Sequence, residues 1–190
     1  TSVSRGLGDV YKRQVQSLTL SNERDQFANV RWPNEGYVTE IANPITSDHT
    51  LLRQYILPSL LRLLAANRHH ELPQRVYELG DVIRDSKNFL RAAWACAEVG
   101  SGFTSSKGIV QALLRDMGAI HDDVEFRPTD AEDGPWISGR GSHVFIQDEK
   151  IGEFGEIDPK VSAFFGIKSP IQAGEIDLET IYRIIPDPIS

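Results

Sequence analysis

Ten consecutive residues near the middle of the chain, Leu90 to Val99, are almost all apolar: Leu-Arg-Ala-Ala-Trp-Ala-Cys-Ala-Glu-Val. Such a run is typical of a strand covered on both faces, because a strand with one solvent-facing side alternates apolar and polar residues. The rest of the chain must therefore supply elements that cover a sheet. The single cysteine, Cys96, lies inside this run and is predicted to fill the core as an inert thiol.

A second constraint lies between Asn43 and Gly80, where the pattern predicts two helices followed by a strand. Pro58 suits the first turn of the second helix, because its fixed φ angle fits there and its missing N–H is not needed. Four leucines at helical spacing then form one apolar stripe: Leu57, Leu60, Leu61 and Leu64. Pro73 ends the helical pattern, and the next residues alternate like a half-buried strand.

The remaining sequence predicts short strands and capped helices. Polar side chains that can accept a free backbone N–H mark four helix starts: Ser21, Ser47 or Asp48, Thr104 or Ser105, and Asp158. Alternating or apolar runs predict strands at residues 15–20, 37–42, 75–79, 90–99, 123–127, 143–147, 150–157 and 171–176, with a hairpin around Asp148-Glu149. Residues 128–141 form a long predicted loop, and no element is predicted from Ile181 onward. We expect an α+β domain with a largely antiparallel sheet and flanking helices mainly on one side.

Composition limits the class of protein. The 190 residues fit one domain, and 40% hydrophobic and 25% charged residues are ordinary for a globular chain. A net charge of −7 disfavours a general nucleic-acid-binding surface, so that contact with a polyanion would have to be local. No apolar run approaches the roughly 20 residues of a membrane span. A single cysteine suits a reducing, cytoplasmic setting.

The first fourteen residues differ from the rest. Residues 1–14 show neither helical nor strand periodicity and resemble the translated adapter-like text found in open reading frames assembled from environmental sequencing. We expect a non-native or disordered leader there, with native sequence beginning near Val15, and base no function on it.

Motifs for catalysis or metal binding are scarce. Gly139-Arg140-Gly141 lacks the third glycine and the strand-then-helix context of a phosphate-binding loop. His69 and His70 are adjacent and point to different faces, so we expect hydrogen bonding at a helix end and no metal site. No nucleophile–base arrangement is recognisable.

Several longer blocks carry a family resemblance. They are Asn43-Pro44-Ile45 through Leu52-Arg53, Leu57 through Leu61, Asn67 through Pro73, Tyr77 through Val82, Phe103-Thr104 with Lys107-Gly108 and Leu113-Leu114, Ser138-Gly139-Arg140, and Ile151 through Pro159 with Phe165-Gly166. In this order they resemble the beta subunit of phenylalanine–tRNA ligase of the archaeal or eukaryotic type. The resemblance runs from about Val15 to Leu178.

The resemblance implies a class II aminoacyl-tRNA synthetase core-like domain at residues 15–183, with a tail at 184–190, that has lost its catalysis. An active core uses two arginines, because a triphosphate and a developing pyrophosphate need guanidinium donors in fixed places. Arg84 falls where the first would stand, but Ser86 replaces the expected glutamate. The final arginine-bearing motif is absent, and Gly155-Glu156-Ile157-Asp158 stands in its place. We therefore predict no catalytic residue and keep Arg84 only as a weak candidate for ATP binding.

Partners follow from the same resemblance. It implies packing against a catalytic alpha subunit in an α2β2 heterotetramer, contact with tRNA(Phe) through that complex, and a cytoplasmic location. ATP and magnesium would serve the whole complex, and this chain would bind no cofactor and no membrane. The editing site, the family's metal-binding segments and a first interface helix would lie upstream, which makes the chain a carboxyl-terminal fragment. Candidate subunit or tRNA contacts are Arg53, Arg68, His69, His70, Glu71 and Arg75.

Two alternatives stay open. A divergent catalytic core would activate an amino acid with the help of Arg84. A tRNA-binding module would use Arg62, Arg68, His69 and His70, although the negative net charge disfavours it.

Overall fold

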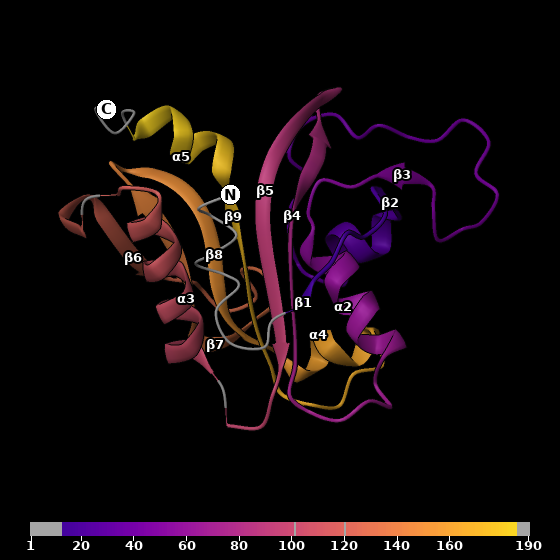
Figure 1. Cartoon of the computed structure of the whole chain (residues 1–190). Helices are drawn as coiled ribbons and strands as arrows, with labels where there is room; N and C mark the ends of the chain where they lie inside the picture. The colour runs from indigo at the N-terminus through magenta and orange to yellow at the C-terminus, as the bar shows by residue number, and fades with distance from the viewer. Residues whose placement is uncertain (1–12, 101, 120, 186–190) are drawn as a thin grey trace.

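The computed structural model describes residues 13–100, 102–119 and 121–185. Within them, a seven-stranded sheet forms the centre of the molecule (Figure 1). In spatial order its strands are β1 (Arg13–Gln14), β4 (Gln74–Arg84), β5 (Lys87–Ala97), β9 (Ile171–Asp177), β8 (Glu149–Ile157), β7 (Trp136–Ile146) and β6 (Val124–Pro128). All neighbouring strands are antiparallel except β1 and β4, which are parallel. The predicted α+β fold with a largely antiparallel sheet is confirmed.

Strand β5 explains how the sheet is covered. Its side chains alternate between two separate hydrophobic clusters: Ala93, Ala95 and Ala97 belong to one, and Ala92, Trp94 and Cys96 belong to the other. All six are buried, so the apolar run is a central strand with both faces covered, as the sequence predicts. The strand begins three residues before Leu90 and ends two residues before Val99.

In the described part of the chain, four α-helices cover the sheet, two on each face (Figure 1). Helices α2 (Leu57–Ala66) and α4 (Pro159–Phe164) cover one face. Helices α3 (Phe103–Asp116) and α5 (Leu178–Ile184) cover the other. The expectation of helices mainly on one side was wrong, because a strand that is apolar on both faces must be covered twice. The predicted leucine stripe of α2 is confirmed, with Leu57, Leu60, Leu61 and Leu64 all buried.

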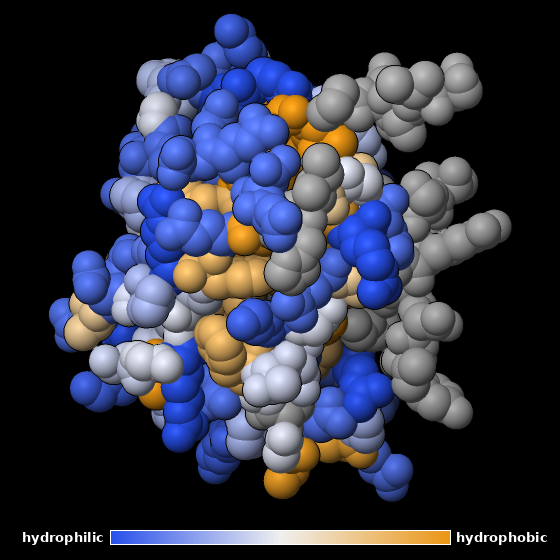
Figure 2. Space-filling model, turned by 90° about the vertical axis from the view of Figure 1, so that its left-hand side faces the viewer, coloured by the Kyte–Doolittle hydropathy of each residue, from blue (hydrophilic) through white to orange (hydrophobic). Residues whose placement is uncertain are grey.

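Figure 2 shows the side of the molecule that carries α3, β6 and α5. Hydrophilic side chains surround an apolar band across the middle of this face. Half-buried residues at the margin of the second core cluster include Phe103, Ile109, Met117 and Phe126.

The region before α2 departs most from prediction. No helix follows Ser47 or Asp48; turns there lead into β3 (Leu51–Leu52), which pairs with β2 (Leu20–Ser21). A capping residue without an apolar helical stripe behind it was a weak signal. The short helix after Ser21 is a π-helix, η1 (Arg24–Ala28). Before it, the side chain of Asn22 accepts a hydrogen bond from the backbone N–H of Asp25 at 2.9 Å.

The two strands predicted in this region are reduced to short contacts. Of residues 15–20, only Leu20 belongs to a strand, although Val15 donates its N–H to the Tyr77 carbonyl at 2.9 Å. Of residues 37–42, only Glu40 forms an isolated bridge, with Leu51. The predicted leader lies outside the described residues up to position 12, but Arg13 and Gln14 pair with β4.

In the second half of the chain, the predicted loop at 128–141 is shorter, because β7 already begins at Trp136. A short 3-10 helix, η2 (His121–Asp123), precedes β6. The β7–β8 hairpin turns at Gln147 and Asp148, one residue earlier than predicted, and both have positive φ angles (50° and 64°). Residues from Ile181 are no tail: Ile181 is fully buried and α5 extends to Ile184.

Candidate functional site

A small pocket of about 80 Å³ lies over the sheet, between the start of α2 and the strands β4, β5, β8 and β9. Its side chains come from separate parts of the chain, including Tyr55 just before α2, Arg84 on β4, Arg91 on β5 and Glu175 on β9. Ligand pockets in proteins typically enclose about 300–1,000 Å³. This pocket holds many charged groups and little space.

Arg84, the weak ATP-binding candidate, lines this pocket. Its guanidinium forms an ion pair with Glu35 and donates to the carbonyl oxygen of Gln54 at 2.9 Å. It also lies over the ring of Tyr55, 4.9 Å from the centroid. Burial, together with the nearby charge of Arg91, lowers the pKa of Arg84. Most donors of the arginine are therefore already used inside the chain.

Glu175 joins the sheet to the first turn of α2. Its carboxylate accepts the backbone N–H groups of Ile56 and Leu57 at 2.8 and 2.7 Å, and so caps the start of the helix. Its second oxygen accepts from Nε of Arg91 at 2.6 Å. Burial alone would lower the pKa of Arg91, but Glu175 and Asp177 raise it above its ordinary value. The Glu175 carboxylate thus both caps the start of α2 and pairs with a buried arginine.

The other charged groups of the pocket are also hydrogen-bonded within the chain. Glu153 accepts from Nε1 of Trp136 at 2.9 Å and from Nζ of Lys150 at 3.1 Å. Asp177 caps α5 by accepting the N–H and the hydroxyl of Thr180. Among the described residues, no group of three or more His, Cys, Asp or Glu side chains could hold a metal ion. The arrangement suits a rigid, internally neutralised scaffold better than a site that receives a charged ligand.

Tyr55, Arg91 and Glu175 line the pocket but are not among the predicted site residues. Residues 155–158, where the sequence offers a substitute for the final motif, lead into α4. The strand that lines the pocket is β9, which runs directly into α5. A usable signal existed, because Arg91 directly precedes the apolar residues 92–97 and Glu175 lies between Gly174 and Ile176. Such a residue predicts a buried partner.

Arg53, a predicted subunit or tRNA contact, is buried within this chain. Its side chain is 2% exposed, and its guanidinium pairs with Glu78 at 2.5 Å. It also donates to Ser17 Oγ at 2.8 Å and to the carbonyl oxygen of Asp81 at 3.0 Å. The pair is a buried link between β4 and the residue that follows β3, and Ser17 joins the segment before β2 to it.

The other predicted contacts lie near the end of α2. Arg68, His69, His70 and Glu71 are exposed in the turn between α2 and β4. Arg75 is half-buried at the start of β4 and forms a two-pronged ion pair with Glu98, with N–O distances of 2.5 and 3.1 Å. The structure thus brings four of the six candidates together on one exposed turn.

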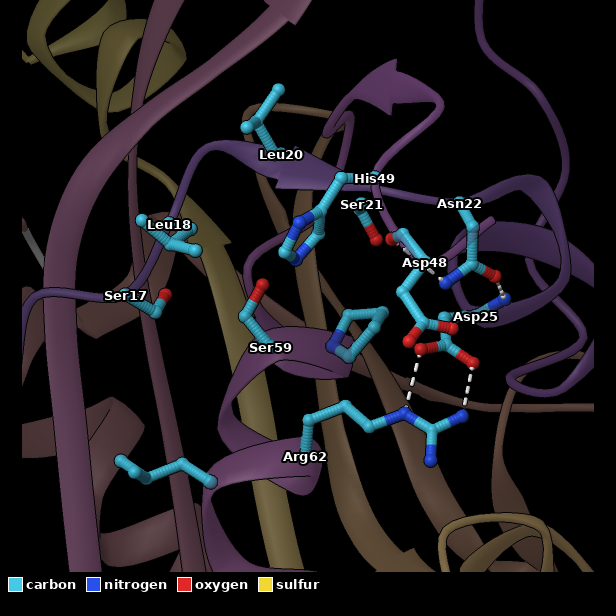
Figure 3. A pocket seen from close by; sticks show the side chains of 12 residues that line it. Ser17, Leu18, Leu20, Ser21, Asn22, Asp25, Asp48, His49, Ser59 and Arg62 are labelled. Carbon is cyan, nitrogen blue, oxygen red and sulfur yellow. Dashed lines mark hydrogen bonds and ion pairs between the residues drawn. The ribbon is translucent and has the colours of Figure 1, made fainter. Parts of the chain in front are cut away.

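Figure 3 shows a second pocket, of about 420 Å³, between the start of α2 and residues 17–22 and 48–49. Arg62 extends from α2 to Asp25 and makes two hydrogen bonds of 2.6 and 2.7 Å with its carboxylate. Arg62 was a candidate in the tRNA-binding alternative. Its guanidinium pairs with an acid on its own chain, and half of the side chain stays exposed.

The fold resembles that of a known aminoacyl-tRNA synthetase. The solved structure of a pyrrolysyl-tRNA synthetase, PylSc from Desulfitobacterium hafniense, matches with a TM-score of 0.75 and covers 96% of this chain and 64% of that one. The two sequences are only 16% identical, so this likeness concerns the fold alone. The fold is that of a class II aminoacyl-tRNA synthetase core.

The family model of the phenylalanyl-tRNA synthetase beta chain CLM domain matches residues 12–178. The chain belongs to the phenylalanyl-tRNA synthetase beta chain family. Curated relatives named phenylalanine–tRNA ligase beta subunit include those of Archaeoglobus fulgidus (34% identity over 171 residues, 89% of this chain and 30% of that one), Methanopyrus kandleri (37% over 175, 88% and 29%) and Pyrococcus furiosus (37% over 178, 90% and 31%). The chain therefore spans about three tenths of the length of these beta subunits. Within the described part, none of the helices has the length and apolar content needed to cross a membrane.

Proposed function

We propose that this domain is a non-catalytic scaffold of a phenylalanine–tRNA ligase, which packs against the catalytic alpha subunit. The observation that carries the proposal is the pocket over the sheet. It has the setting of a class II core, yet Glu35 and Glu175 pair with the two arginines that line it. Its volume of about 80 Å³ is well below the roughly 300–1,000 Å³ of typical ligand pockets.

Further parts of the proposal rest on the family. We infer a place toward the carboxyl-terminal end of a longer beta subunit, an α2β2 assembly, contact with tRNA(Phe) within it, and a cytoplasmic location. Phenylalanine activation with ATP and magnesium is assigned to the alpha subunit, and no cofactor to this chain. The curated relatives named as beta subunits, at 34–37% identity, support this assignment.

Copurification tests the proposal. The chain is co-expressed with a tagged alpha subunit from one of the archaeal relatives, and the complex is captured on the tag. We expect the chain to be retained in near-equal amount. The core of the pyrrolysyl-tRNA synthetase serves as the control, because it shares the fold at 16% identity and should not be retained. A folded chain that elutes without the alpha subunit would contradict the proposal.

A further inference from the structure

Strand β6 (Val124–Pro128) forms one end of the seven-stranded sheet and lies at the left of Figure 1. Its inner side pairs with β7, and within the described residues no strand pairs with its outer side. An edge strand presents a row of backbone N–H and C=O groups that another chain can pair with. The outer side of β6 is therefore a surface to test for a partner.

Backbone hydrogen bonds at both ends of β6 determine which of its residues face β7. The N–H of Thr129 donates to the Gly141 carbonyl at 3.1 Å, and the N–H of Gln147 donates to the Asp123 carbonyl at 3.2 Å. Bonded residues alternate along an antiparallel ladder, so the odd-numbered positions of β6 bond to β7. The even-numbered positions direct their N–H and C=O groups outward.

Three residues of β6 thus present backbone groups at the edge. Val124 and Phe126 each offer an N–H and a carbonyl, whereas Pro128 offers only its carbonyl. The side chains of Val124 and Phe126 are half-buried at the margin of the second core cluster. Phe126 packs edge-on against Phe154, with ring centroids 5.7 Å apart, and Nζ of Lys107 lies 5.0 Å from its ring centroid. Further burial of these apolar side chains would stabilise a contact made at the edge.

Two charged residues, Glu125 and Arg127, project from the other face of β6. The Glu125 carboxylate accepts two hydrogen bonds of 2.8 Å from Arg127, which also pairs with Asp148 at 2.9 Å. The guanidinium lies over the ring of Phe145, 3.9 Å from its centroid. Charges on an edge strand commonly discourage pairing with another chain. Here, however, the two charges have opposite signs and occupy alternate positions.

This charge pattern makes the edge self-complementary. If two copies pair antiparallel around a two-fold axis at Phe126, Glu125 of each copy lies directly opposite Arg127 of the other. These positions form a non-hydrogen-bonded pair, in which opposite side chains approach most closely. Parallel pairing in register would instead place like charges opposite each other, which is destabilising. The charges therefore favour a second copy in one register.

We propose that the β6 edge binds a second copy of this chain, so that two sheets join into one. The two Phe126 residues exchange both backbone hydrogen bonds across the axis, and each Val124 N–H donates to the Pro128 carbonyl of the other copy. The two Phe126 rings meet on the α3 face, and the four charges alternate in sign on the other face. The contact involves only copies of this chain and does not rest on the proposed packing against the alpha subunit.

Sedimentation velocity of the full chain over a concentration series tests the contact. The strand contributes five residues a side. Because such a contact is small, we expect a weak dimer, with a Kd on the order of 10–100 µM. Glu125→Arg and Arg127→Glu each place like charges opposite each other, so each variant alone should dimerise about tenfold more weakly. A wild type that stays monomeric across this range, or variants that dimerise as strongly as the wild type, would overturn the proposal.

Mixing the two variants separates pairing from folding. Chains with Glu125→Arg and chains with Arg127→Glu carry opposite charges at both facing positions, so the mixture should associate about as strongly as the wild type. A variant that had merely unfolded would not recover on mixing. The matched controls are Glu23→Arg and Arg24→Glu, which reverse exposed charges at the start of η1 and should leave dimerisation unchanged. A mixture that stays monomeric, or controls that weaken the dimer equally, would overturn the proposal.

Hydrogen exchange measured by NMR reports the same edge residue by residue. The amide protons of Val124 and Phe126 should exchange more slowly as the concentration of the wild type rises, because the second copy protects them. The amide of Glu125 already bonds to β7 and should not respond. Protection of Phe126 only when the alpha subunit is added would assign the edge to that partner and overturn the proposal. Copurification is scored separately, so that retained copurification without dimerisation rejects this contact alone.

Discussion

Tyr55 lies at the centre of the pocket over the sheet. Its ring centroid is 4.9 Å from the guanidinium carbon of Arg84 and 5.8 Å from that of Arg91. Its hydroxyl donates to the carbonyl oxygen of Pro33 at 2.6 Å, and its ring packs against Trp32. Burial, and then the negative charge of Glu35, raise the pKa of Tyr55. The phenol is therefore held as a neutral donor that supports both arginines.

Tyr55→Phe should change how stability depends on alkaline pH. The folded pKa is raised above the unfolded value of about 10, so the contribution is fully present below pH 10 and is lost as the pH rises further. Each pH unit above 10 costs the wild type up to about 1.4 kcal/mol through this group. We expect the variant to lose about 1 kcal/mol at neutral pH, from the missing hydrogen bond, and to fall less steeply above pH 10.

Urea unfolding between pH 7 and 11 measures this effect. Tyr182→Phe is the control, because Tyr182 is exposed on α5 and should leave both the neutral stability and the slope unchanged. A Tyr55→Phe curve parallel to that of the wild type above pH 10 would contradict the role of the buried phenol.

Arg53 and Glu78 show what sequence cannot reveal at this scale. The two residues are 25 positions apart, and Ser17, which bonds both, is 36 positions from Arg53. Nothing local marks this arginine as buried, so it resembled the exposed cations that follow α2. Removing one partner of such a pair leaves an uncompensated buried charge, which typically costs about 3–5 kcal/mol.

At the scale of elements, close contact between β8 and β9 depends on glycine. Gly152 faces Ile176 across the pair. A Cβ at Gly152 would overlap the backbone oxygen of Glu175, the residue that caps α2. Backbone on one strand cannot yield as a flexible side chain would, so strand pairing and the helix cap would shift together.

Gly152→Ala should therefore lower the free energy of unfolding by about 1–3 kcal/mol or more. The matched control is Gly108→Ala inside α3, where nothing lies within 4 Å of the added methyl group. Alanine favours a helix interior over glycine, so the control should raise stability by about 0.5–1 kcal/mol. Urea denaturation measures the free energy of unfolding of both variants. A change of the same sign in the two variants would refute the prediction.

Elements with a strong periodic pattern were predictable, and those held by distant contacts were not. The leucines of α2 and the apolar run of β5 have patterns long enough to read locally. Helix α5 has only seven residues, with Leu178 and Ile181 as its buried pair, and so looked like a tail. The stretch after Asp48 has a cap but no apolar stripe, and it pairs as β3 instead.

At the scale of the whole molecule, the two core clusters on opposite faces of the sheet account for the class II fold. The fold class followed from recurring strands and hairpins. The ion pairs that fill the pocket could not be predicted, because the paired residues are far apart in sequence. Glu35 is 49 positions from Arg84, and Glu175 is 84 positions from Arg91. The sequence could show a missing arginine motif, but not which acids neutralise the arginines that remain.

This class II core is occupied by its own ion pairs, and we propose that it does not activate an amino acid. Phenylalanine-dependent exchange of pyrophosphate into ATP, measured on the purified, folded chain with magnesium, tests the claim most directly. We predict exchange no greater than that of a heat-denatured sample, both in the wild type and in Arg84→Ala. Exchange that depends on phenylalanine and disappears in Arg84→Ala would contradict the claim.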